Sequence, residues 1–435
     1  MKKDALLSAI IVFVYTIFFI SIFFSFRAIS SISIGVLLIA GITKHDGQIK
    51  NTIRHNKARL FLIACITFFL LQFIPLLYTS NSNEEWKNIL LKSGMVLIPL
   101  AVMLSGPFEE HSQKKLLVAY CLSLLAAGLY CLFKSFLFYR STGNVPVFYY
   151  HELVKPLQQH AVYFSIYIFI SLVLLLENIQ RKIWGINNIV SLSLITFFSI
   201  LLFLLSSKLI ITFYILYLLY YLILLTRKTV LNRKVTTVVI AAIVIVISTI
   251  FFTNNPISDR FRDITAGKLA VIKQDKYTPG DYFNGIQFRL LQWKLVSEIL
   301  NTHNSWWKGV GAANAQPFLD EEYIAKDMYL GDPSTGNRGY REYNTHNQFL
   351  ESLLNNGIPG LLAMLFIYFT LIKIILQKKQ SISTFIIALL LIYAAIESVF
   401  ETQYGIILFT FFPVFLCVEN KNEPTINHPI SILKQ

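Results

Sequence analysis

The sequence predicts an all-α membrane protein that crosses the bilayer many times. Of its 435 residues, 55% are hydrophobic and 14% aromatic, while only 14% are charged, which is too apolar for an ordinary soluble protein. A second observation is that apolar runs recur along the chain at roughly the 17 to 25 residues needed to cross a hydrocarbon core. The third is that basic residues gather in the short connectors between these runs, the positive-inside pattern.

About twelve runs have the length of a membrane span. They are expected near residues 5–25, 27–43, 59–78, 90–107, 116–138, 161–177, 187–206, 208–226, 236–253, 359–377, 383–400 and 404–418. The boundaries of the second, seventh, eighth and twelfth spans are the least sharply marked, and residues 187–226 also fit one bent hairpin. The first run lacks a small-residue cleavage pattern, so we interpret it as a span and not as a signal peptide.

Charge placement predicts which side each segment faces. The net charge is +14, yet the polar stretch 254–345 holds 11 Lys and Arg against 11 Asp and Glu. The basic excess therefore lies in the connectors, which argues against a nucleic-acid partner and for both termini in the cytoplasm. Four regions follow: spans one to nine in residues 1–253, a large outer loop in 254–358, spans ten to twelve in 359–418, and a cytoplasmic tail in 419–435.

Two helices are expected in the large loop. Residues 284–300 carry Phe288, Leu291, Leu295 and Ile299 at helical spacing, which predicts a helix with one apolar face. A second helical pattern follows Asn347 and is closed by Asn355-Asn356-Gly357 and Pro359. His346 is therefore expected at the beginning of a short helix.

His346 and Arg289 are the first candidates for chemistry. A histidine at a helix N-terminus is favoured in its neutral form, which can act as a base, and such a terminus also attracts phosphate oxygens. The alternative is that Thr345 or Asn344 caps the helix and His346 is an ordinary interfacial residue. The forked guanidinium of Arg289 suits a diphosphate, although a solvated surface charge has the same local sequence.

Charged residues within or beside the apolar runs form a second group of candidates. Lys208 interrupts a long apolar region and must face water, a partner or an anionic ligand, unless it reaches the interface from a tight hairpin. Glu397 is isolated near the expected outer end of the eleventh span, where it is placed to orient His346 or to pair with a cation. Lys92 begins the fourth span on the same side. Arg260 follows the ninth span, where an anchor at the headgroup layer is the simpler interpretation.

The sequence does not favour a metal or another cofactor. His151, His160 and His346 show no spacing typical of metal ligands. The four cysteines lie in apolar runs and none lies in the large loop, so no disulfide or thiolate site is expected. His160, which flanks the shorter outer loop, is instead expected to contact the substrate. Asn347 completes the set of expected substrate contacts.

An ordered set of motifs resembles one known superfamily. Arg289 and Trp293 on a helix are followed by Trp307-Lys308-Gly309-Val310-Gly311, then by Thr345-His346-Asn347-Gln348-Phe349-Leu350, and then by Asn356-Gly357-Ile358-Pro359-Gly360 at the start of an apolar span. This order is similar to that of the O-antigen ligase and O-antigen polymerase superfamily of lipid-linked glycan transferases in the bacterial inner membrane. The likeness is clearest over residues 280–365.

The resemblance implies a GT-C-like fold and a metal-independent, inverting glycosyltransferase. Its donor would be a glycan on undecaprenyl diphosphate, and its active site would face the periplasm. In the ligase branch the acceptor is lipid A-core. By the family pattern His346 would be the base, Arg289 and Lys208 would bind the diphosphate, and Glu397 would have an orienting role. The family commonly has an arginine where this chain has Lys208, so the charge is kept and the fork is lost.

Other interpretations remain open on the sequence alone. A repeat-unit polymerase would pass the glycan to a growing glycan, and a protein O-oligosaccharyltransferase would pass it to a protein. A flippase or transporter of lipid-linked glycans would belong to a different class of protein. Such a protein would be expected to have two related halves and charged residues along a central route. Loop aromatic residues such as Trp306, Trp307 and Tyr343 are candidates for sugar stacking or for interface anchoring.

Overall fold

We analysed a computed structural model of the protein. The structure describes residues 2–45, 47–181, 186–227, 237, 241, 269–278, 280–281, 283–332, 334, 337 and 339–418. Within these residues it is helical, and its β-structure is limited to an isolated bridge between Asp332 and Asn337. The predicted all-α polytopic fold is confirmed.

Helices occupy the expected spans in the described part of the chain. The segments long and apolar enough to cross a membrane number 8. They contain α1 (Lys2–Phe23), α2 (Arg27–Lys44), α4 (Arg59–Leu71), α5 (Ser82–Lys92) with α6 (Gly94–Ser105), α7 (Glu110–Thr142), α9 (Ala161–Arg181), α11 (Lys208–Arg227) and α16 (Gln348–Lys378). Shorter apolar helices are α10 (Asn188–Leu204), α17 (Ser381–Ala394) and α18 (Gln403–Phe415). The ninth expected span, residues 236–253, lies outside this part of the structure apart from two positions.

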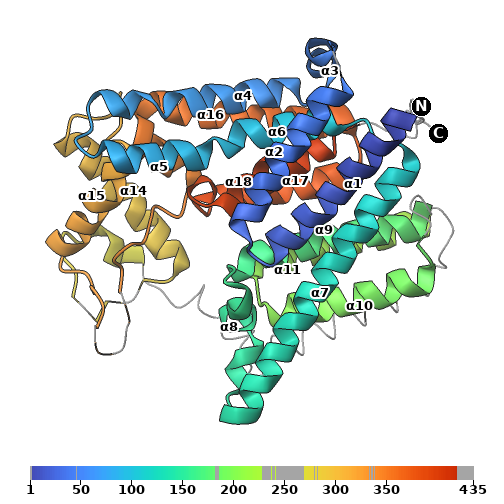
Figure 1. The fold of residues 1–435 in the computed structure, drawn as a ribbon. Coiled ribbons are helices and arrows are strands. Elements are labelled where there is room, and N and C mark those ends of the chain that lie inside the picture. Colours follow the sequence, from blue (N-terminus) through green and yellow to red (C-terminus); the bar gives the residue numbers. More distant parts are fainter. Residues whose placement is uncertain are drawn as a thin grey trace, which may run out of the picture.

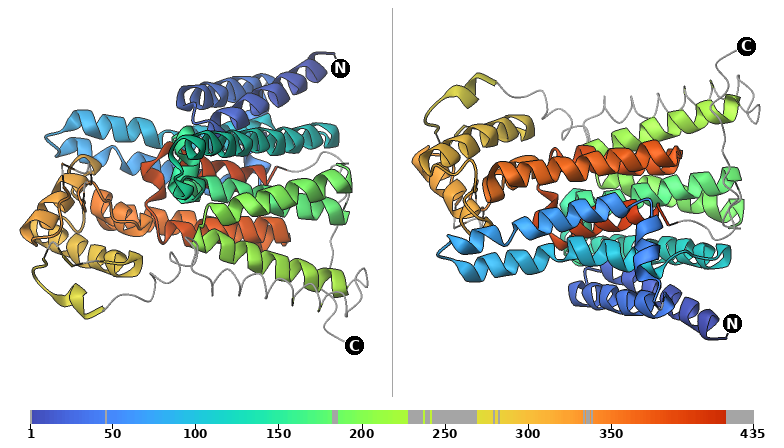
Figure 2. Two further views of the ribbon diagram at one scale, coloured as in Figure 1. Left: turned by 90° about the horizontal axis from the view of Figure 1, so that it is seen from below. Right: turned by 90° about the horizontal axis from the view of Figure 1, so that it is seen from above.

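The long helices form a bundle with the large loop at one end. Figure 1 shows α14 (Gly285–Thr302) and α15 (Ala312–Ala325) together at the left, and α1 begins at the opposite end. The two views of Figure 2 show the same separation. The remaining short helices are α3 (Ile49–His55) and α8 (Tyr150–Val154), with 3-10 turns at Ile74–Leu77, Val145–Phe148, Lys155–Leu157, Leu269–Lys273 and Val399–Glu401. Polar chemistry in the large loop is thus concentrated at one end.

Helix α14 forms where the apolar spacing predicts it. Asn284 accepts from the backbone N–H groups of Ile286 and Gln287, and the Gln287 side chain accepts from the Asn284 N–H, so the helix begins with a capping box. Phe288, Leu291 and the other expected apolar residues of this face are buried. They pack with α15 and the beginning of α16 in a small core separate from that of the bundle. This core fixes the loop helices at the bundle's end.

A break in α16 locks the large loop to the bundle. Gly357 has φ 63° and ψ −158°, a conformation that interrupts the helix. Ile358 N–H donates to Trp306 O instead of to Leu354 O, and Pro359 has no N–H to give to Asn355 O. The two freed carbonyls instead accept from Val310 and Gly311 of the loop, at 2.8 and 3.0 Å. The expected closure at 355–359 is confirmed, and the backbone groups it releases are satisfied.

The eleventh span is shorter than expected. The sequence predicts a helix over 383–400, whereas α17 ends at Ala394 and the chain continues through a non-helical stretch to the 3-10 turn Val399–Glu401. Glu397 and Ser398 therefore lie beyond the helix. The apolar run could not reveal this end, because Ile396, Val399 and Phe400 continue the hydrophobic pattern after the helical hydrogen bonds stop.

Candidate active site

His346 lies before α16, not within it. Asn347 is the N-cap residue, and its side-chain oxygen accepts from the N–H groups of Phe349 and Leu350 at 2.9 and 3.1 Å. His346 has φ 46°, a left-handed conformation, and Asn344 Oδ1 accepts from its backbone N–H. The expectation that His346 begins the helix is therefore wrong by two positions. It follows that Asn347 already occupies two N–H groups that a phosphate would otherwise bind.

The imidazole of His346 pairs with Glu397. Its Nδ1 lies 3.1 and 3.2 Å from the two carboxylate oxygens of Glu397. An ionised carboxylate can only accept a hydrogen bond, so Nδ1 carries the proton and donates it. Nε2 then has the lone pair, and no described residue forms a hydrogen bond with it. In this tautomer the 25% exposed His346 side chain has its basic nitrogen on the side of the ring away from Glu397.

The surroundings keep Glu397 ionised. Burial raises the pKa of this carboxyl, but the hydrogen bond from His346 and the electrostatic interactions with His346, His160 and Arg289 together bring the pKa below its ordinary value. Three expected site residues from separate segments therefore act electrostatically on one carboxylate. The pairing of His346 and Glu397 was one of the arrangements that the sequence left open.

Arg289 reaches the same place from α14. Its Nε and Nη2 donate to Ile396 O at 2.9 and 2.8 Å, and its Nη1 donates to Gly285 O at 2.6 Å. Burial lowers the pKa of Arg289, which the negative charge of Glu397 opposes, and an arginine remains charged at any working pH. These three bonds leave two of its five N–H groups for a ligand. Arg289 thus fixes the backbone beside Glu397 and retains part of its fork.

His160 immediately precedes α9 and lies near enough to Glu397 for their electrostatic interaction to lower the pKa of that carboxyl. The ring of His151 stands 4.5 Å from that of His160, and the ring of Tyr163 stands 5.7 Å away. Val162 N–H donates to Nδ1 of His160 at 3.3 Å, so a neutral His160 ring carries its proton on Nε2. The short connection before α9 thereby adds an exposed imidazole near the site. His151 is a neighbour that the sequence suggested only for a metal.

Lys92 is placed differently from the other cations. Its side chain is 1% exposed and its Nζ lies 3.1 Å from Glu401 Oε1. Glu85 and Glu351 are close enough for the charge of Lys92 to act on both. This arrangement supports a buried structural pair that joins α5 to the turn after Glu397. The role of Lys92 as a direct substrate ligand stays a prediction.

The two remaining cations of the expected set are less closely defined. Lys208 is half-buried at the first position of α11, after the buried Ser206 and Ser207. Figure 1 shows α11 beside α9, and the up-and-down order of α9, α10 and α11 places Lys208 at the same end as His160. Arg260 lies outside the described residues.

Aromatic rings enclose His346 on its loop side. Tyr343 and Phe288 have ring centroids 5.5 and 5.9 Å from that of His346. Tyr343 is exposed, as are Trp306 and the 74% exposed Trp307, whereas Tyr323 is buried and cannot stack on a sugar. Sequence reasoning missed the polar residues behind the pair, Glu351 and Ser398. The available signal for Glu351 was that it is the one acidic residue of α16 and lies in its first turn.

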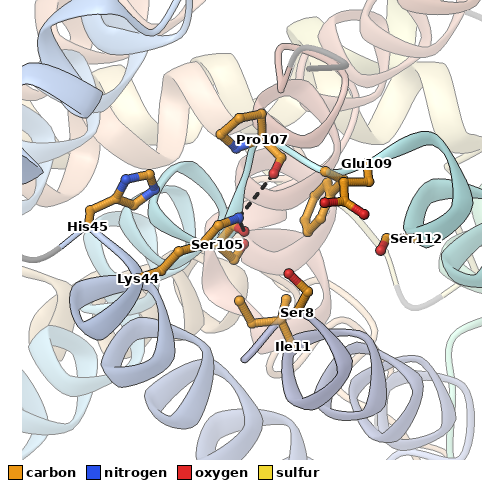
Figure 3. A pocket seen from close by; sticks show the side chains of 9 residues that line it. Ser8, Ile11, Lys44, His45, Ser105, Pro107, Glu109 and Ser112 are labelled. Carbon is orange, nitrogen blue, oxygen red and sulfur yellow. Dashed lines mark hydrogen bonds between the residues drawn. The ribbon is translucent and has the colours of Figure 1, made fainter. Parts of the chain in front are cut away.

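Neither a metal cluster nor the polar cavity of the described structure competes with this site. In the described residues no group of three or more His, Cys, Asp or Glu side chains is arranged to hold a metal. A cavity of about 250 Å³ lies where α2 meets the connection from α6 to α7 (Figure 3). There Lys44 donates to Ser105 O and Pro107 O, so it satisfies carbonyl groups at the end of α6. Lys44 is therefore already used by the backbone at this cavity.

A comparison with known protein families finds a match. Residues 192–365 match a family model described as O-antigen ligase, which confirms the superfamily resemblance drawn from the motifs. The match includes Lys208, Arg289 and His346, and it ends before Glu397. A comparison with curated proteins gives no match.

Proposed function

We propose that this chain, which carries an O-antigen ligase domain over residues 192–365, transfers a glycan from undecaprenyl diphosphate to lipid A-core. Members of the family are glycosyltransferase-like enzymes. The observation that carries the proposal is the His346 and Glu397 pair, with its basic Nε2 directed away from the carboxylate and with Arg289 beside it. The reaction would take place at the periplasmic face of the bacterial inner membrane, with both termini in the cytoplasm.

The proposed reaction is one in-line displacement. Nε2 of His346 takes the proton of the acceptor hydroxyl while that oxygen attacks the anomeric carbon of the donor. The bond from this carbon to the diphosphate breaks, and the leaving oxygen keeps the electron pair. The configuration at the anomeric carbon is inverted. Glu397 holds the proton on Nδ1 and stabilises the imidazolium that forms.

The leaving diphosphate needs positive charge and hydrogen-bond donors. The two N–H groups of Arg289 that its backbone bonds leave unused are the proposed donors, and His160 is a further proposed contact. Lys208 is the proposed second cation, and Arg260, Lys92 and Asn347 remain predicted contacts. Fixed cations in a partly buried site supply the stabilisation without a metal or other cofactor.

The test is transfer by the purified protein in vesicles. The protein is reconstituted with undecaprenyl diphosphate glycan and, in parallel samples, with lipid A-core, a growing glycan or an acceptor protein, and products are identified by mass spectrometry. Product on lipid A-core supports the ligase, and product on either other acceptor assigns the polymerase or the protein transferase. Movement of donor across the vesicles with no product on any acceptor would establish a transporter and contradict the enzyme.

A substitution of His346, compared with a control substitution of another histidine, tests the proposed mechanism. His346→Ala should lower the turnover number by about 10²- to 10⁴-fold, the usual contribution of a general base, while donor binding stays within a small factor. His303→Ala is the control, because His303 is also an exposed loop imidazole and stacks on Phe318, 4.1 Å away. Equal activity of the His346→Ala and control variants would remove His346 as the base.

In the cell, deletion of the gene distinguishes the acceptors. Core that lacks all attached glycan indicates a ligase, core with one repeat unit indicates a polymerase, and normal lipopolysaccharide with altered glycoproteins indicates the protein transferase.

A further inference from the structure

A single buried carboxylate lies behind both members of the His346 and Glu397 pair. Thr345, which precedes His346, has its Oγ1 2.7 Å from Glu351 Oε2, and Ser398, which follows Glu397, donates to the same oxygen at 3.3 Å. The two hydroxyl oxygens are 3.1 Å apart. Thr345, Ser398 and Glu351 are all buried. Two segments separated by some fifty residues are therefore joined through one atom.

Further hydrogen bonds connect the same two segments. Phe400 N–H donates to Gln348 Oε1 at 2.7 Å, and Asn347 N–H donates to Ser398 Oγ at 3.3 Å. Gln348 is fully buried. These hydrogen bonds hold the stretch from Ser398 to Phe400 against the beginning of α16. His346 immediately precedes one of the two bonded segments, and Glu397 immediately precedes the other. The distance between their side chains therefore depends on these hydrogen bonds.

The cost of burying Glu351 argues that its hydrogen bonds are specific. A buried carboxylate is costly unless hydrogen bonds and nearby positive charge compensate it. Thr345 and Ser398 supply the former, and Lys92, itself paired with Glu401, supplies part of the latter. Glu351 also lies in the first turn of α16, where the helix dipole favours a negative charge. An apolar side chain would fill the space but could not connect the two hydroxyl groups.

We propose that Glu351 is a positioning residue that sets the geometry of the His346 and Glu397 pair through Thr345 and Ser398. It touches neither substrate nor the reacting atoms. Its effect on turnover rests on the proposed function, whereas its effect on the imidazole does not. The experiment therefore measures both the reactivity of the His346 imidazole and the turnover number.

The first readout is the chemical reactivity of His346. Diethyl pyrocarbonate acylates the unprotonated imidazole nitrogen, and mass spectrometry of the His346 peptide at pH 8 gives the rate. Thr345→Val removes the hydroxyl at nearly constant size and should change this rate by about fivefold, the size typical of coupled neighbours. In a Glu397→Ala background the same substitution should change it by less than about twofold, because the geometry it disturbs no longer exists.

Two further variants separate positioning from general destabilisation. Glu351→Gln keeps the size of the side chain and removes its charge, and it should reproduce the Thr345→Val result. Ser381→Ala breaks an equivalent bond elsewhere, from Ser381 Oγ to Glu177 Oε1 at 2.6 Å, and should leave the His346 rate unchanged. Equal changes from Thr345→Val with and without Glu397, or an equal effect of Ser381→Ala, would overturn the proposal.

The second readout is glycan transfer by the same variants. Thr345→Val and Glu351→Gln should lower the turnover number by about tenfold and leave donor binding unchanged, as expected when only transition-state geometry is lost. Wild-type protein that forms no product while the reactivity cycle stays non-additive would contradict the proposed function and keep the positioning role. Active wild-type protein with an additive cycle would do the reverse.

Discussion

At the scale of single residues, the ionisation of Glu397 predicts how stability depends on pH. Its pKa is lower in the folded protein than its ordinary value, so the ionised form stabilises the fold above about pH 4.3, the value for an unperturbed glutamate. This contribution is lost as the pH falls through the lower folded value. Glu397→Gln should therefore lower the thermal midpoint in detergent at pH 7, and the gap to wild type should narrow below about pH 4.

The control for Glu397 is Glu321→Gln, because Glu321 is an exposed carboxyl of α15. It should shift the midpoint little at any pH. A gap for Glu397→Gln that is constant from pH 7 to 3 would show that the carboxylate gains nothing from His346, His160 and Arg289.

Lys92 offers a second residue-scale prediction. Lys92→Met removes the buried member of the pair and leaves the partly buried Glu401 without its cation, which should destabilise the protein by about 1 to 3 kcal/mol. Lys87→Met is the control in the same helix, since Lys87 is 71% exposed and pairs with the exposed Glu84; the expected loss is about 1 kcal/mol or less. Thermal unfolding in detergent measures both. A stable Lys92→Met variant with a raised KM for donor would instead assign Lys92 to the substrate.

For the helices, the local sequence predicted their positions well but did not predict which segments they contact. The periodic apolar residues of α14 and the closure after Asn355 depend on neighbours in the chain, so the pattern was sufficient. The end of α17 at Ala394 depends on tertiary hydrogen bonds to Arg289 and Gln348, which composition does not record. For the same reason Glu397 could be suspected from its isolation, while the connection through Glu351 could not be found.

The break in α16 at Gly357 predicts how a substitution there affects stability. A Cβ at Gly357 would lie 2.5 Å from the backbone carbon and oxygen of Trp307, and the positive φ disfavours any L side chain. Gly357→Ala should therefore destabilise the protein by more than about 2 kcal/mol and release the loop 306–311. Gly35→Ala in α2 is the control, because a Cβ there meets nothing within 4 Å. Similar thermal midpoints for the two variants would show that the break is not required.

At the scale of the whole molecule, the two ends of the bundle have different tasks. At one end Lys44, the last residue of α2, satisfies a carbonyl group where α6 ends. The large loop's end instead gathers His346, Glu397, Arg289 and His160, which come from four segments. A transferase needs this asymmetry, because its donor lipid stays in the membrane and its acceptor arrives from one side. The topology is therefore the property of the whole chain that most directly tests the proposal.

Cysteine labelling measures the topology with little background, because Cys65, Cys121, Cys131 and Cys417 are all buried. Trp307→Cys places a thiol at a 74% exposed position of the large loop, and Lys50→Cys places one at an exposed position of α3. In intact cells with a permeable outer membrane, a maleimide that cannot cross the inner membrane should label Trp307→Cys alone. Lys50→Cys should react only after the inner membrane is opened, because the basic connector that contains it is expected in the cytoplasm. Labelling of both variants on the same side would contradict the predicted span count, and the reverse order would place the His346 site in the cytoplasm, where a periplasmic transferase cannot work.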